Sequence, residues 1–138
     1  MARDDLLRRI GDVNDFSRPR PLVSLSEFFD GNDDPASIGY NLPDPPSPAE
    51  FAAVLGAIAD RPEVDDVRIE VKDHEDPDGW PATDSVWIVT SASAADVRSW
   101  FPDALAPDEC EAHPSGDGGA VEPIDVPVGR HAVVAFYD

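Results

Sequence analysis

The segment 73–79 has the composition of a metal-binding loop. It reads Asp-His-Glu-Asp-Pro-Asp-Gly, so carboxylates and an imidazole are concentrated within a few residues. If Gly79 is aligned with the glycine of an EF-hand loop, His74 takes the first ligand position and Ser85 the twelfth, where carboxylates are needed. The same residues form a type I turn without any metal, because Pro, Asp and Gly suit its successive positions. We expect a solvated hairpin turn here and no metal ligands.

Other residue types that carry catalysis are dispersed along the chain. His74, His113 and His131 stand singly, without the paired spacing of zinc ligands or a neighbouring nucleophile. The single cysteine, Cys110, has acidic neighbours, which raise the pKa of a thiol and disfavour the reactive thiolate. The 29 acidic residues allow too many pairs for any one to indicate acid–base catalysis. The sequence therefore indicates no cofactor, and it favours a protein that is not an enzyme.

The charge of the chain is extreme. Its formal net charge is -19 over 138 residues, whereas a magnitude of about 2 to 8 suits a small soluble domain. Such a charge repels nucleic acid, whose binding depends chiefly on Lys and Arg at phosphates, so we expect no nucleic-acid partner. A net charge of this sign favours binding to a basic protein. It equally fits a host with a salt-rich cytoplasm or a GC-rich genome, because salt screens the repulsion and GC-rich codons favour Asp, Ala and Arg.

The N-terminal residues bear on location. Residues 1–10 lack the apolar core and cleavage site of a signal peptide, and no apolar run approaches the ~20 residues of a membrane span. We expect a cytoplasmic protein with no membrane partner.

The elements that must position these residues centre on a predicted β-hairpin. In the strand predicted over 64–72, apolar residues alternate with charged ones, as in a strand with one buried face. The second strand, 86–89, is apolar throughout, which predicts cover on both faces or an interior place in the sheet. A third strand of this kind is expected at 132–137.

Helices are predicted before and after the hairpin. Ser47 has the position of an N-cap for a helix over 48–60, with proline in its first turn. Short helices are also expected at 2–10, from the spacing of its leucines, and at 94–100.

Residues 22–30 allow two interpretations. Ser24 and Glu27 have the spacing of a capping box, which predicts a short helix over 25–30. A strand over 22–25 competes with it. Both interpretations use the same apolar residues, and the sequence does not decide between the helix and the strand.

The order of these elements predicts an α+β two-layer sandwich, a small mostly antiparallel sheet with helices packed on one face. A ferredoxin-like layout is the first specific arrangement it suggests, and this layout needs the strand at 22–25. We expect one domain over 1–138, with long irregular loops at about 31–47 and 103–129. Apolar residues in the first loop predict that it packs down on the core.

Two loops combine carboxylates with large aromatic residues, and we expect them to bind the partner. Carboxylates steer a cationic partner, while Trp and Tyr are common interface anchors. Trp80 has a second interpretation, because large aromatics in long loops usually pin the loop to the protein body. The predicted partner-binding residues are Asp33, Asp34, Tyr40, Glu75, Asp76, Asp78 and Trp80.

These observations favour a small acidic protein-interaction module that binds a basic protein, as immunity proteins and inhibitors of cationic enzymes do. The alternative is a small enzyme or ligand-binding domain of unidentified chemistry. Its site would lie between the 32–46 loop and the sheet, and the acidity would reflect the host.

Overall fold

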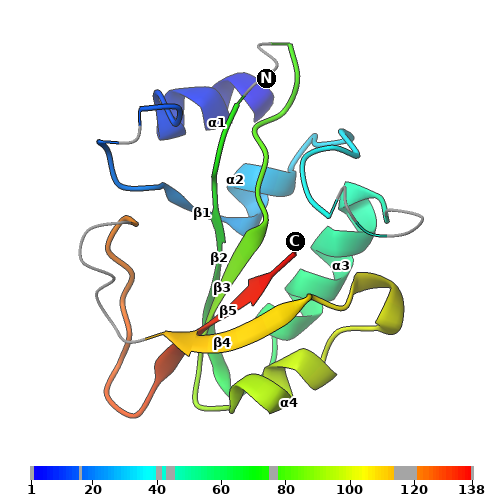
Figure 1. Ribbon diagram of the computed structural model, residues 1–138, viewed down its shortest axis with the longest axis vertical. Helices are drawn as coiled ribbons and strands as arrows, with labels where there is room; N and C mark the ends of the chain where they lie inside the picture. The colour runs from blue at the N-terminus through cyan, green and yellow to red at the C-terminus, as the bar shows by residue number, and fades with distance from the viewer. Residues whose placement is uncertain are drawn as a thin grey trace.

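A computed structural model describes residues 2–15, 17–39, 42, 46–74, 78–113 and 121–137. Its strands form one five-stranded antiparallel sheet accompanied by helices (Figure 1), which confirms the α+β class. No helix in these ranges is long and apolar enough to cross a membrane. In chain order the elements are α1 (Ala2–Ile10), β1 (Leu22–Ser24), α2 (Leu25–Phe29), α3 (Pro48–Ala59), β2 (Val64–Glu70), β3 (Ser85–Thr90), α4 (Ala94–Ser99), the 3-10 helix η1 (Asp103–Leu105), β4 (Glu109–His113) and β5 (His131–Phe136).

The strand order is β1-β2-β3-β5-β4, and each of the pairings between these strands is antiparallel. In a ferredoxin-like layout, a third strand lies between the two strands that flank the first helix. Here β1 and β2 flank α2 and α3 in the chain but pair directly, with Leu22 opposite Glu70. The ferredoxin-like layout is therefore wrong, although the class is right.

Both interpretations of residues 22–30 are correct, because the strand and the helix occupy consecutive residues. The Ser24 hydroxyl accepts the Glu27 amide N–H at 3.1 Å, and the Glu27 carboxylate accepts the Ser24 amide N–H at 2.8 Å. This capping box satisfies two backbone donors at the start of α2. Ser24 is thus both the last residue of β1 and the N-cap of α2.

The central hairpin prediction is confirmed by β2 and β3, which pair from Val64 to Glu70 and from Ser85 to Thr90. Strand β3 lies between β2 and β5, and all of its residues are buried. That burial on both faces matches its unbroken apolar run. The turn predicted at 76–79 falls partly outside the described residues.

The prediction of an irregular connection over 103–129 is wrong at residues 109–113. Strand β4 occupies Glu109–His113 and pairs with β5 along its length. Its sequence, Glu-Cys-Glu-Ala-His, contains few of the β-branched and aromatic residues that favour strands. Residues 109–113 therefore form a strand because they pair with the strongly apolar β5, and not because of their own strand propensity.

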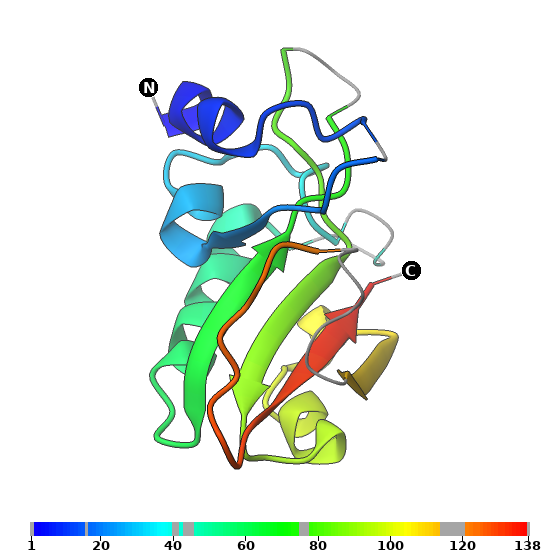
Figure 2. The same cartoon turned by 90° about the vertical axis from the view of Figure 1, so that its left-hand side faces the viewer.

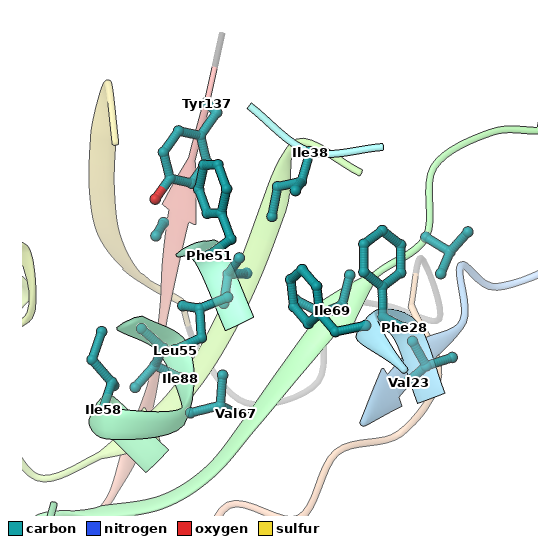
Figure 3. Close-up of a cluster of buried hydrophobic side chains, with 14 of the residues drawn as sticks. Val23, Phe28, Ile38, Phe51, Leu55, Ile58, Val67, Ile69, Ile88 and Tyr137 are labelled. Carbon is teal, nitrogen blue, oxygen red and sulfur yellow. The ribbon is translucent and has the colours of Figure 1, made fainter. Parts of the chain in front are cut away.

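The main core lies between the sheet and the helices (Figure 3). Phe28 of α2 and Phe51 of α3 have no exposed surface, and both pack among the inward-facing residues of the sheet. Ile38, from the loop before α3, is also buried and bridges Thr83. The Thr83 amide donates to the Ser37 carbonyl at 2.8 Å. The described part of the loop around Ile38 is therefore packed down on the core, as its apolar residues predicted.

The opposite face of the sheet has a partial cover made of residues 121–130, drawn in orange in Figure 2. Val121 and Ile124 of this segment pack with Leu22, Trp87 and Val134 in a second, smaller apolar cluster. The described part of this segment thus covers the face around Leu22, Trp87 and Val134.

Glu122 fastens this covering segment to β1 and α1. Its amide donates to the Arg20 carbonyl at 2.8 Å, and its carboxylate accepts the Leu22 amide at 2.9 Å. The same carboxylate lies 2.7 Å from the Arg9 guanidinium. Burial alone would raise the pKa of Glu122, but the hydrogen bonds and charge of Arg9 and the Leu22 amide lower it overall.

Candidate functional site

Two acidic loops that are far apart in the sequence meet at one end of the molecule. The Trp80 amide donates to the Asp34 carboxylate at 3.1 Å. Together with the first turn of α1, the loops line a pocket of about 540 Å³. We call this the acidic loop surface, and it is lined by Arg3, Asp4, Asp33, Asp34, Pro35, Asp78, Gly79 and Trp80.

The structure therefore brings together four of the predicted partner-binding residues, Asp33, Asp34, Asp78 and Trp80. The other three, Tyr40, Glu75 and Asp76, lie outside the described residues.

Hydrogen bonds close the described stem of the hairpin loop. The His74 Nε2 lies 3.1 Å from the Gly79 carbonyl oxygen, and the Arg3 guanidinium donates to the Asp78 carbonyl. Within the described ranges, no group of three or more His, Cys, Asp or Glu side chains is arranged to hold a metal ion.

Trp80 is a structural anchor for its own loop. Its side chain is half-buried and packs against the main core. Its indole Nε1 is buried and has no hydrogen-bond partner in the described part of the chain. An unpaired buried N–H costs free energy, so apolar burial of the ring must outweigh this cost. The anchoring interpretation of Trp80 is therefore the one that its contacts favour.

A second site, which the sequence did not indicate, lies on the face of the sheet away from the helices. It is a groove of about 460 Å³, within the range of about 300 to 1,000 Å³ of small-molecule sites. Figure 2 views the molecule from the side of the segment 121–130 that borders it. We call it the sheet groove, and it is lined by Arg20, Glu70, Lys72, Ser85, Trp87, Glu109, Glu111, Val121, Val134 and Phe136.

Strand register builds this groove from residues that are distant in the chain. One rung of paired residues runs across all five strands, and the rung two residues along runs beside it. Residues two apart on a strand point to the same face, so both rungs supply the groove. The first rung is Leu22, Glu70, Ser85, Phe136 and Glu109, and the second is Ser24, Arg68, Trp87, Val134 and Glu111.

A buried charge forms the β2 wall of the groove. Glu70 is only 6% exposed. One of its carboxylate oxygens accepts the Trp87 Nε1–H at 2.7 Å, and the other lies 2.7 Å from Lys72 Nζ. A buried carboxylate is tolerated only when it is paired and hydrogen-bonded, and both conditions hold here. The charges of Glu70 and Lys72 therefore offset each other, Arg20 adds a positive charge to the lining, and the hydrogen bond from Trp87 holds its ring in a fixed orientation.

The opposite wall, on β4, carries uncompensated negative charge. Glu109 and Glu111 are exposed, and neither carboxylate has an ion-pair partner among the residues that the structure describes. Between the two walls lie Val134 and Phe136. The groove thus has an apolar floor, a wall on β2 whose carboxylate is paired, and an anionic wall on β4.

Ser85 in the groove and Cys110 on β4 carry groups that can act as nucleophiles. The one hydroxyl among the described lining residues, Ser85 Oγ, is hydrogen-bonded to the Asp84 carboxylate at 2.8 Å, and no His or Cys is in the lining set. Cys110 lies in β4 but packs against the main core on the other side. Burial raises the pKa of its thiol, and Arg98 offsets this only in part. A raised pKa of this thiol was expected, although the cause is burial and not the acidic neighbours.

A signal for part of the groove was present in the sequence. Arg68 and Glu70 on β2 and Lys72 just after it alternate with core residues, and Trp87 stands in a strand that is apolar on both faces. The anionic wall left no such signal, because Glu109 and Glu111 reach the groove only through the pairing of β4 with β5.

Fold and groove together define a small α+β protein whose antiparallel sheet has one face under helices and the other partly open. Over residues 1–135 the chain matches the model of the "Uncharacterized protein YfbO family". It is 42% identical over 130 residues to the uncharacterized protein YfbO of Escherichia coli (strain K12), and the match covers 93% of this chain and 90% of that protein. The chain therefore belongs to the YfbO family. No solved structure matches it.

Proposed function

We propose that this protein is a cytoplasmic acidic interaction module that binds a basic protein, in the manner of an immunity protein or an inhibitor. The observation that carries the proposal is the meeting of three segments at the acidic loop surface. Their four carboxylates, from Asp4, Asp33, Asp34 and Asp78, stand against one guanidinium, from Arg3. This gives the pocket a formal charge of -3, since four negative charges and one positive charge line it.

Electrostatic steering follows from this concentration of charge. A pocket lined by one sign of charge focuses its field and raises the rate at which an oppositely charged partner arrives. The net charge of -19 adds a long-range attraction for any basic protein. Steering of this kind weakens as salt shortens the Debye length, which is about 10 Å at 0.1 M and 3 Å at 1 M.

Preorganisation supports the same proposal. The Asp34 carboxylate accepts the Trp80 amide at 3.1 Å and the Ala36 amide at 2.9 Å, so its position is fixed before a partner binds. A carboxylate already held in place loses less conformational entropy on binding. The pocket of about 540 Å³ has room for a Lys or Arg side chain of the partner.

A comparison of three immobilised proteins tests the proposal in native-host lysate. They are the wild type, Asp33→Lys/Asp78→Lys at the acidic loop surface, and Asp60→Lys/Asp103→Lys outside it. Both variants have a formal net charge of -15, since each replaces two negative charges of the -19 total by two positive ones. We expect the wild type and the control to retain the same basic protein at low salt and to release it at high salt. The loop variant should not retain it.

Two results would count against the proposal. One is that no basic protein is retained by the wild type at any salt concentration. The other is equal retention by the wild type and the loop variant.

The sheet groove favours a second candidate function, ligand binding. Between the 32–46 loop and the sheet, where the sequence led us to expect such a site, the described part of the loop places Ile38 with only 1% of its surface exposed. A ligand-binding function would belong to the opposite face of the sheet.

A further inference from the structure

We propose that the sheet groove binds a small organic cation, a molecule with a flat apolar body and a single ammonium or guanidinium group. This site is separate from the acidic loop surface, so the proposal does not depend on whether a basic protein binds to that surface.

The apolar residues of the groove floor determine the size and polarity of the ligand body that can bind. Val134 and Phe136 lie side by side on β5, next to Trp87 on β3, and Val121 borders them from the covering segment. Three strand spacings of about 4.8 Å separate β2 from β4, which places their backbones about 14 Å apart. Once the side chains of the walls are subtracted, this width suits a body of one or two rings.

The walls select the sign of the charge. On the β2 side, Lys72 Nζ is already engaged by Glu70 at 2.7 Å and by Asp84 at 3.5 Å. Arg20 donates to the Lys72 carbonyl. On the β4 side, Glu109 and Glu111 have no ion-pair partner in the described residues. The described lining holds three carboxylates and two cations, a formal charge of -1, and its negative side is the β4 wall, where a cationic ligand would pair with Glu109 and Glu111.

The buried network makes this more than a cluster of surface acids. Charged residues on an edge strand also discourage pairing with other sheets, and that role alone would explain Glu109 and Glu111. It would not explain a carboxylate buried to 6% exposure in the same rung, or its 2.7 Å hydrogen bond from Trp87. This network orients the Trp87 ring next to Phe136, the partly exposed residue of the floor, and a few fixed polar groups in an apolar pocket are typical of small-molecule sites.

The Trp87 indole N–H provides a reporter that lies within the site. Its resonance in a proton–nitrogen correlation spectrum can be followed during titration, with the indoles of Trp80 and Trp100 as internal references, since the chain has three Trp residues. The probes are 2-phenylethylamine, its neutral analogue 2-phenylethanol, the anion phenylacetate, and spermidine, which is a cation without an apolar body.

We expect 2-phenylethylamine to shift the Trp87 indole resonance saturably, and the three other probes to bind at least about tenfold more weakly. In Glu109→Gln/Glu111→Gln, its affinity should fall at least about tenfold. In the control Asp60→Asn/Asp103→Asn, which removes the same charge elsewhere, it should stay within about twofold. The single variants Glu109→Gln and Glu111→Gln serve if the double variant does not fold.

The proposal is overturned by any of three outcomes: no saturable shift of Trp87, equal affinity for the amine and the alcohol, or equal loss in the groove and control variants. The first two remove the ligand class, and the third shows that only the net charge matters.

Discussion

Trp87 donates its indole Nε1–H to a carboxylate oxygen of Glu70 at 2.7 Å, diagonally across the central strand pair β2 and β3. Both residues are nearly inaccessible, with 3% and 6% of their surface exposed. Among the described residues, the bond joins the largest side chain on this face of the sheet to the one buried carboxylate. It links the stability of the fold to the shape of the sheet groove.

Replacing Trp87 by Phe tests this link. The substitution removes the donor and leaves a Glu70 oxygen without that partner, so we expect the free energy of unfolding to fall by about 1 to 3 kcal/mol. Trp100→Phe is the matched control, because Trp100 is half-buried and stacks against Arg61 at 4.4 Å. Urea denaturation of both variants gives the comparison. Equal losses would mean that ring size, and not the Glu70 bond, sets the cost.

Ile58→Ala tests the main core. Ile58 is 2% exposed on the inner face of α3, so its truncation should lower the free energy of unfolding by about 2 to 5 kcal/mol through lost burial and a cavity. Arg68→Ala should cost at most about 1 kcal/mol, because Arg68 pairs with Asp66 at a partly exposed position. Similar costs for the two variants would contradict the assigned orientation of α3 and β2.

Glu122→Gln gives a pH-dependent prediction. The pKa of Glu122 is lowered from the ordinary value of 4.5, so its contribution to stability is present above that pH and is lost as the pH falls through the folded-state pKa. We expect the variant to be less stable than the wild type by about 1 kcal/mol at neutral pH. The difference should vanish in acid. A difference that grows on acidification, measured by denaturation at several pH values, would have the wrong sign.

Salt should stabilise the protein. With a net charge of -19, the folded chain experiences strong self-repulsion, and added ions screen it. The thermal midpoint should rise between low salt and about 1 M NaCl, where the Debye length is near 3 Å. A flat or falling midpoint in calorimetry would show that the structure already compensates these charges.

Elements with local signals were predictable from the sequence. Ser24 and Ser47 lie at N-caps, and their hydroxyls accept the amides that the capping patterns predicted. The apolar run of β3 marked it as an interior strand. These signals reside in a few neighbouring residues, so no knowledge of the partner strands was needed.

The candidate sites depended on contacts between distant residues and were only partly predictable. Asp34 and Trp80 are 46 residues apart, and the grouping of their two loops rested on composition, not on a predicted contact. The groove required the register that sets Phe136 between Ser85 and Glu109. Register is set by strand pairing, so the sequence around Glu109 did not indicate that this residue lies across the groove from Glu70.

The association rate with a basic partner, measured against salt concentration, tests the central claim most directly. Asp33→Lys/Asp78→Lys should slow association by about tenfold or more at low salt and flatten its salt dependence. Asp60→Lys/Asp103→Lys, with the same net charge, should stay close to the wild type. If the two variants instead associate at the same rate, the acidic loop surface does not steer the partner and the proposed interaction site is contradicted.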